Sequence, residues 1–120
     1  MVAKIGHGAS LFVSISYNKL KVDDEYGKVL FAQHIIEQSD GTYQMPDILH
    51  SFEPYLSANR RTEKPVIHIS LNPNPSDKVN DKAFSEMGQR YMKELGFGEQ
   101  PYIVFKHTDI ERTHIHIVSL

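Results

Sequence analysis

Two histidines, His114 and His116, lie two positions apart in the β-branched segment HIHIVSL near the C-terminal end of this 120-residue chain. In a β-strand, residues two apart project from the same face, so the two imidazoles would lie side by side. Paired imidazoles are typical ligands of a divalent transition metal. Because the chain contains seven histidines, one His-x-His pair is weak evidence for a metal site when taken alone.

A third histidine, His107, follows the β-rich segment Pro101–Lys106. The HTDIER link between the two segments is too short for a parallel crossover, so a hairpin is predicted, and it brings His107 back beside the pair. Three imidazoles leave coordination positions open, as a catalytic metal site does. The alternative is a set of surface histidines. That alternative explains less well why strand alternation places Ile115 and Ile117 on the core face and the histidines together on the other face.

Three further residues could support such a site. Asp109 and Glu111, in the link, could orient the imidazoles through hydrogen bonds, or they could be ordinary polar loop residues. His68, in the segment PVIHISL, shares its strand face with Val66 and Ser70 and could approach from a neighbouring strand. The alternative for His68 is a histidine whose hydrogen bonds are satisfied within the sheet.

Turn signals and periodicity divide the rest of the chain into short elements. Strands are predicted over Val29–Ile36, Pro65–Leu71, Pro101–Lys106 and His114–Leu120. Helices are predicted over Met45–Asn59, with a kink or break at Pro54, and from Asn80 or Asp81 to Gly96. The segment Leu11–Tyr17 is ambiguous, because its apolar residues alternate as in a strand while Ser10 could cap a helix.

Composition narrows the class of protein. The length fits one domain, and the absence of cysteine excludes disulfides and thiolate metal sites. No apolar run approaches the roughly 20 residues that cross a bilayer, and the first residues lack the features of a signal peptide, so a cytoplasmic protein without a membrane partner is expected. The net charge of −2 counts against a protein that wraps duplex DNA.

The run from His107 through Thr108-Asp109 to His114-Ile115-His116 resembles the third motif of mobilisation relaxases, which belong to the HUH endonuclease superfamily. That superfamily is named for two histidines flanking a hydrophobic residue. The likeness is to the relaxases on mobile elements of Bacteroides-type bacteria. It extends to the MVAKI start, the S-Y-N segment at Ser16–Asn18, KPVIHISLNPNPSD at Lys64–Asp77, and ELGFGEQPYIVFKH at Glu94–His107.

The resemblance implies a specific chemistry. A tyrosine at the position of Tyr17 would attack the scissile phosphate of single-stranded DNA at a transfer origin, giving a 5′-phosphotyrosyl intermediate for plasmid or transposon mobilisation. His107, His114 and His116 would hold a divalent metal, Mn²⁺ or Mg²⁺ with Zn²⁺ as a further candidate. Accessory mobilisation proteins would be partners. Two rival functions are considered. In the first, the chain is a non-catalytic module for DNA binding or assembly; in the second, it is a metal-dependent phosphodiesterase that uses water.

Tyr17 is favoured over Tyr26 as the nucleophile. The acidic run Asp23–Glu25 directly before Tyr26 would repel a phosphate, whereas Asn18 and Lys19 after Tyr17 could bind one. The alternative for Tyr17 is that it packs with the apolar residues that precede it.

The expected fold is α/β of the α+β type, with a mainly antiparallel sheet of about four to five strands, helices packed on one face, and the metal on the open face. The resemblance favours a helix over Leu11–Tyr17. It also implies that residues 1–120 are an N-terminal fragment of a longer relaxase catalytic domain, in which case Ile115–Leu120 would be an exposed edge strand.

Overall fold

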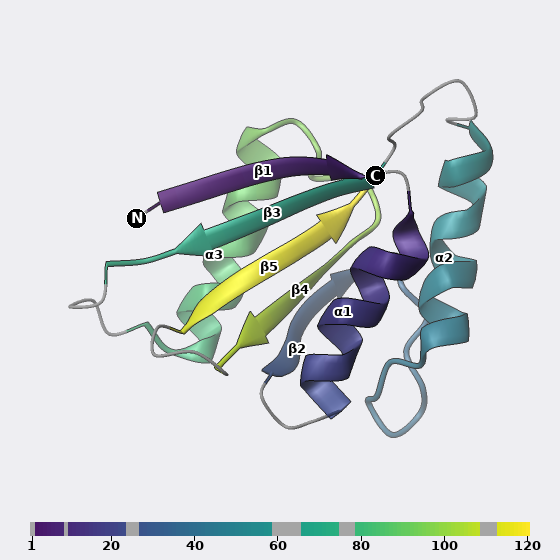
Figure 1. Ribbon diagram of the computed structural model, residues 1–120, viewed down its shortest axis with the longest axis horizontal. Helices are drawn as coiled ribbons and strands as arrows, with labels where there is room; N and C mark the ends of the chain where they lie inside the picture. Colours follow the sequence, from purple (N-terminus) through teal and green to yellow (C-terminus); the bar gives the residue numbers. More distant parts are fainter. Residues whose placement is uncertain (1, 9, 24–26, 59–65, 75–78, 109–112) are drawn as a thin grey trace.

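The computed structural model describes residues 2–8, 10–23, 27–58, 66–74, 79–108 and 113–120. Its elements are β1 (Val2–Gly8), α1 (Leu11–Asp23), β2 (Gly27–Gln33), α2 (Met45–Ala58), β3 (Val66–Asn72), α3 (Asp81–Glu94), β4 (Tyr102–His107) and β5 (His114–Ser119) (Figure 1). The strands form one five-stranded sheet in the order β1-β3-β5-β4-β2, and every neighbouring pair is antiparallel. The predicted α+β class and antiparallel sheet are confirmed.

Helices cover both faces of the sheet, so the expectation of helices on one face is wrong. Helices α1 and α2 pack on one face and α3 packs on the other (Figure 1). Strand β4 shows the reason, because Ile103 and Phe105 belong to the core under α1 and α2, while Tyr102 and Val104 belong to the core under α3. A sheet whose central strands are apolar on both sides requires a covering layer on each face.

Helix α3 follows its sequence signals closely. The side chain of Asn80 accepts a hydrogen bond from the amide of Ala83 at 2.8 Å and caps the first turn. Phe84, Gly88 and Met92 are buried at a spacing of four, so one stripe of the helix faces the sheet. A side chain on Gly88 would begin 3.3 Å from Val104 Cγ2, so the glycine lets the helix lie close against β4.

The segment Leu11–Tyr17, whose pattern fitted both a strand and a helix, is the first part of helix α1. Ser10 Oγ accepts a hydrogen bond from the Val13 amide at 3.2 Å, and Leu11, Ile15 and Asn18 are buried at helical spacing. The strand suggested by alternation is therefore wrong, and the helix that the resemblance favoured is confirmed.

Helix α2 continues through Pro54, so the predicted break does not occur there. Ile48 and Phe52 are fully buried, while Pro54 itself is exposed. Packing of the buried residues therefore outweighs the lost backbone hydrogen bond of the proline. Among the described residues, no helix is both long enough and apolar enough to cross a membrane.

The sheet edges differ from the expectation. Strand β5 pairs with β3 on one side and β4 on the other, so it is central, and the predicted edge strand at Ile115–Leu120 is wrong. The edges are β1 and β2. Strand β1, which the sequence did not predict, pairs along its length with β3.

Candidate active site

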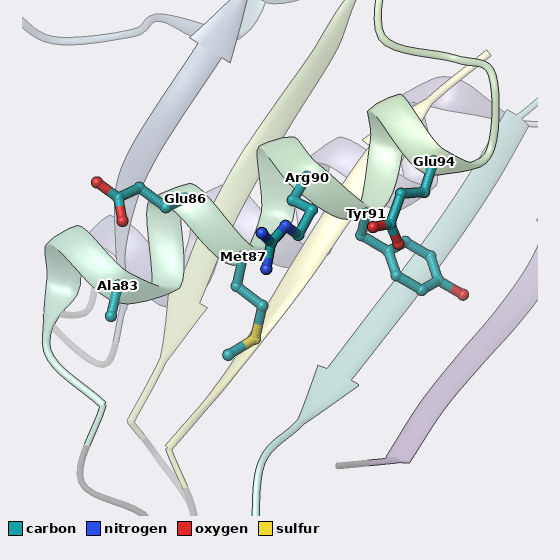
Figure 2. Close-up of a pocket in the computed structure, with 6 residues that line it drawn as sticks. All are labelled: Ala83, Glu86, Met87, Arg90, Tyr91 and Glu94. Atoms are coloured by element: carbon teal, nitrogen blue, oxygen red, sulfur yellow. The ribbon is translucent and has the colours of Figure 1, made fainter.

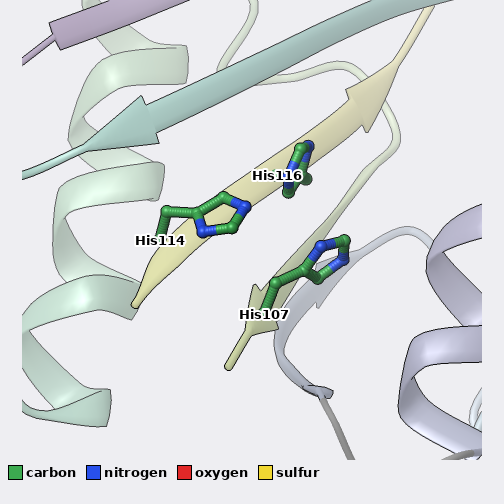
Figure 3. A group of neighbouring side chains, drawn as sticks. All are labelled: His107, His114 and His116. Carbon is green, nitrogen blue, oxygen red and sulfur yellow. The ribbon is translucent and has the colours of Figure 1, made fainter. Parts of the chain in front are cut away.

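Three histidines converge at the hairpin of β4 and β5. His107 and His114 are cross-strand partners, and His116 lies two residues further along the same face (Figure 3). One nitrogen from each ring lies within 4.8 Å of the others, and the centroids of the His107 and His116 rings are 4.2 Å apart. The structure therefore brings together the three side chains that the strand faces predicted. That they bind a metal stays a prediction.

The cluster lies on the face that α1 and α2 cover, and not on an open face as expected. His107 is only 1% exposed and His114 7% exposed, while His116 is half-buried. The same face is apolar directly beside the cluster, where Phe105, the strand partner of His116, and Val118 enter the core. The imidazoles thus occupy a largely desolvated end of the sheet, where electrostatic interactions are stronger than in water.

His68 reaches this cluster from β3. Its Nε2 lies 2.7 Å from Nδ1 of His116, and the residue paired with His116 across the strands is Ser70. Burial lowers the pKa of His68 and so favours its neutral form, which can accept a hydrogen bond. A metal-binding imidazole usually donates from its other nitrogen. If His116 Nδ1 donates to His68, Nε2 of His116 is the nitrogen left for a metal.

Tyr17 lies beside the cluster, on α1. The centroid of its ring is 6.1 Å from that of His107, and the side chain is 54% exposed. The alternative in which Tyr17 is a core residue is therefore wrong. Tyr26, Asp109 and Glu111 lie outside the described residues.

The comparisons with known proteins bear directly on this arrangement. A family model described as "Relaxase: MobA/VirD2-like, nuclease domain" matches residues 17–119, a range that includes Tyr17 and all four clustered histidines. The chain belongs to this relaxase family. No curated protein and no solved structure matched it. The family expected from the histidine motif is confirmed, whereas the narrower likeness to Bacteroides-type relaxases stays a prediction. Membership in the family indicates DNA nicking for mobilisation as the general activity.

Asn18 of the relaxase domain does not have the role that the sequence suggested. Its side chain is fully buried, and its Nδ2 donates to the Ser14 carbonyl at 2.7 Å, so it cannot bind a phosphate at the surface. Within the described part of the chain, Asn18 Oδ1 is buried without a hydrogen-bond partner. The helical spacing of Leu11, Ile15 and Asn18 is the signal that would have placed it on the inner side of α1.

The donor set of the relaxase site fits a transition metal. Two nitrogens that each lie about 2.0–2.2 Å from one tetrahedral ion are about 3.3–3.6 Å apart, so the rings would move closer together than the 4.8 Å that bounds their present separations. Imidazole nitrogens suit zinc and related transition metals, whereas Mg²⁺ prefers oxygen ligands. On these ligands alone, Mg²⁺ is the poorest match among the metals expected from the resemblance.

A separate hollow runs along α3 on the other side of the relaxase domain. Figure 2 shows Met87 and Tyr91 extending from the same side of the helix, and both pack against the core under α3. The lining residues are Ala83, Glu86, Met87, Arg90, Tyr91 and Glu94. They include both acidic and basic side chains but no histidine, and they lie across the sheet from the imidazole cluster. We assign no chemistry to this hollow.

Proposed function

We propose that this relaxase domain nicks single-stranded DNA at a transfer origin by transesterification, acting within a longer relaxase and with accessory mobilisation proteins. Tyr17 is the nucleophile, and His107, His114 and His116 hold a divalent metal. The observation that carries the proposal is the position of the exposed Tyr17 ring, 6.1 Å from His107 at the border of a cluster whose ligand nitrogens lie within 4.8 Å. A nucleophile and a metal would then act on the same phosphate.

The proposed reaction exchanges one ester for another. Tyr17 Oη attacks the phosphorus, a phosphorus–oxygen bond forms, and the bond to the 3′ oxygen breaks. The phenol loses a proton and the leaving 3′ oxygen gains one, so no water is consumed and the strand can later be rejoined. A metal bound by the histidines would supply a Lewis acid that stabilises negative charge on the phosphate oxygens.

The contacts of the site support separate roles for its residues. The exposure of Tyr17 leaves the hydroxyl-bearing ring accessible to a DNA strand, while the burial of His107 and His114 holds their rings in place. His68 orients His116 through the 2.7 Å contact between their rings. The nucleophile thus comes from a helix and the ligands from rigid strands, so each group is fixed by a different element.

Two labels on the DNA test the reaction type. Single-stranded oligonucleotides from candidate transfer origins carry a fluorophore at the 3′ end in one set and at the 5′ end in another, and each is incubated with the protein and Mn²⁺, Zn²⁺ or Mg²⁺. On a denaturing gel, the 3′ label should move with the protein and the 5′ label with a shorter free fragment. Two free fragments would instead indicate the phosphodiesterase, and uncut DNA with metal bound would indicate the non-catalytic module.

Replacing Tyr17 with Phe tests the nucleophile. The Tyr17→Phe variant keeps the ring and removes only the hydroxyl, so the covalent adduct should disappear while metal binding and the unfolding temperature stay unchanged. Tyr91→Phe, on α3 across the sheet, makes the same chemical change away from the site and should form the adduct normally. A normal yield from Tyr17→Phe, mapped by peptide mass to Tyr26 or another residue, would overturn the assignment.

A further inference from the structure

The outer side of α1 carries a group of exposed apolar side chains next to Tyr17. Phe12 is 59% exposed, Val13 64% and Tyr17 54%. These three are half of the six large apolar residues that are exposed in the described part of the chain, and they lie within six positions of one another. Single exposed apolar residues are ordinary, whereas several on one helix beside a proposed active site indicate an interaction surface.

Two of these side chains form a path along α1 that ends at the histidine cluster. Val13 and Tyr17 are four residues apart and therefore neighbours on the helix surface. Phe12 does not face Val13, because consecutive residues of a helix point in different directions, and it lines a groove between α1 and the first turns of α2. The groove is lined by Ser10, Leu11, Phe12, Pro46, Leu49, His50 and Glu53. At the other end of the path, Tyr17 lies against His107.

We propose that this face of α1 binds single-stranded DNA by base stacking, with Phe12 stacking on a base close to the scissile phosphate. The inference rests on the proposed function, because a strand joined to Tyr17 begins on the helix that also carries Phe12. Aromatic side chains bind bases through their π-faces with little dependence on sequence. The apolar walls of the groove, formed in part by Pro46 and Leu49, suit the flat face of a base.

The charge of the protein also favours recognition through bases. Affinity for phosphates requires clustered Lys and Arg, and the chain has 13 such residues against 15 acidic ones. The groove itself contains the acidic Glu53, which would repel a phosphate, and no Lys or Arg. Within the groove a strand is therefore held by stacking and apolar contact, whereas Lys19, two residues beyond Tyr17 on α1, is placed to contact a phosphate nearer the nucleophile.

Binding of a fluorescein-labelled oligothymidylate, followed by anisotropy in the presence of EDTA, separates DNA binding from cleavage. Phe12→Ala should weaken binding between about 5-fold and about 150-fold, the range that one stacked base provides. Phe12→Tyr keeps an aromatic ring and should bind as the wild type does. Ile5→Ala is the matched control, because Ile5 is 49% exposed on β1 and its strand partner Ile69 belongs to the core under α3, on the other face.

The salt dependence of binding identifies the kind of contact. Because Phe12 contacts no phosphate in this proposal, Phe12→Ala should leave unchanged the slope of the logarithm of affinity against the logarithm of salt concentration. Equal affinities of Phe12→Ala and the wild type, with both proteins folded by circular dichroism, would overturn the proposal, as would a reduced slope.

These outcomes are distinct from those of the nicking assay. If the wild type forms the Tyr17 adduct but Phe12→Ala binds the oligonucleotide equally well, stacking is wrong and nicking stands. If binding depends on Phe12 but no adduct forms with any origin strand and metal, stacking stands and the nicking proposal fails. If the wild type binds no single-stranded DNA, both proposals are wrong.

Discussion

The two faces of the sheet are built from the same strands but differ in composition. The face under α3 is apolar except near the end of β4, where Lys106 pairs with Asp81. Its apolar side chains come from Ile67, Ile69, Leu71, Tyr102, Val104, Ile115 and Ile117. The face under α1 and α2 is divided. Val66, Ile103, Phe105 and Val118 form its apolar part, and two histidines lie directly beside them, since His116 pairs with Phe105 and His68 pairs with Val118. His107 and His114 lie beyond, at the end of β4 and the start of β5.

Strand alternation is the physical source of this difference. In β5, Ile115 and Ile117 enter the core under α3, while His114 and His116 project from the opposite face. Each apolar residue of the strand thus fixes the backbone that holds its histidine neighbours. Substitutions of the histidines should therefore change activity, whereas substitutions in the core under α3 should change stability.

The largest effect is expected from His114→Ala, on the divided face. Loss of one of three ligands should reduce metal-dependent adduct formation to background, while the apolar core retains the fold. In the wild type, a metal at 100 times its dissociation constant should stabilise the folded state by about 2.7 kcal/mol, and this increase should be absent in the variant. The denaturing gel measures the adduct, and thermal unfolding with and without Mn²⁺ or Zn²⁺ measures the stabilisation.

The matched control is His7→Ala. His7 is exposed on the edge strand β1, and its partner Ile67 lies on the face under α3. The control variant should keep both the adduct and the metal-induced stabilisation. A His114→Ala variant that retained full metal stabilisation would show that the ligand set is wrong.

The next prediction concerns stability and is made for Phe84→Ala, in the core under α3. Phe84 is 1% exposed in the core under α3, and truncating a buried Phe costs about 3–5 kcal/mol through lost burial and the cavity left behind. Urea unfolding should show this loss, while the additional stabilisation by metal should keep its wild-type size. A loss of the metal increment in a folded Phe84→Ala protein would mean that the two faces are coupled.

The parts of the fold that were predicted correctly have local signals. The hairpin of β4 and β5 follows from two β-rich segments with a short link, and α3 follows from the Asn80 cap and a stripe that includes Phe84. The convergence of the histidines was predictable for the same reason, since alternation within β5 and the hairpin decide it.

The parts that were missed depend on pairing between distant segments. Strand β1 has the sequence VAKIGHG, whose glycines and polar residues give no clear alternation, and it is a strand because β3 pairs with it. The central place of β5 likewise follows from strand order, which no single segment encodes. The cover on both faces did have a local signal, because the consecutive residues Tyr102–Phe105 are all apolar. For His68 the sequence left two interpretations open, an approach to the histidine cluster or hydrogen bonds within the sheet. The sequence could not decide between them, because the contact with His116 requires β3 to lie beside β5.

The smallest effect is expected from an ion pair that ties α3 to its face of the sheet. Asp81, in the first turn of α3, contacts Lys106 Nζ at 2.5 Å and Lys28 Nζ at 2.6 Å. Lys28 and Lys106 are cross-strand partners on β2 and β4, so Asp81 separates two like charges that would otherwise repel each other. Hydrogen bonds from Lys106 and Lys28 lower the pKa of the Asp81 carboxyl.

Asp81→Asn should therefore destabilise the protein at neutral pH, but by no more than about 1 kcal/mol, because the pair is partly exposed and screened by water. A carboxyl whose pKa is lowered by folding contributes stability above its unfolded pKa of about 3.9, and this contribution is lost as the pH falls through the lower folded value. Urea unfolding should thus show a difference between wild type and Asp81→Asn that shrinks in high salt and vanishes in acid. Glu86→Gln on the same helix makes the same change of charge and should have a smaller effect. A difference that persisted unchanged in acid would show that Asp81 stabilises α3 through a charge-independent contact instead.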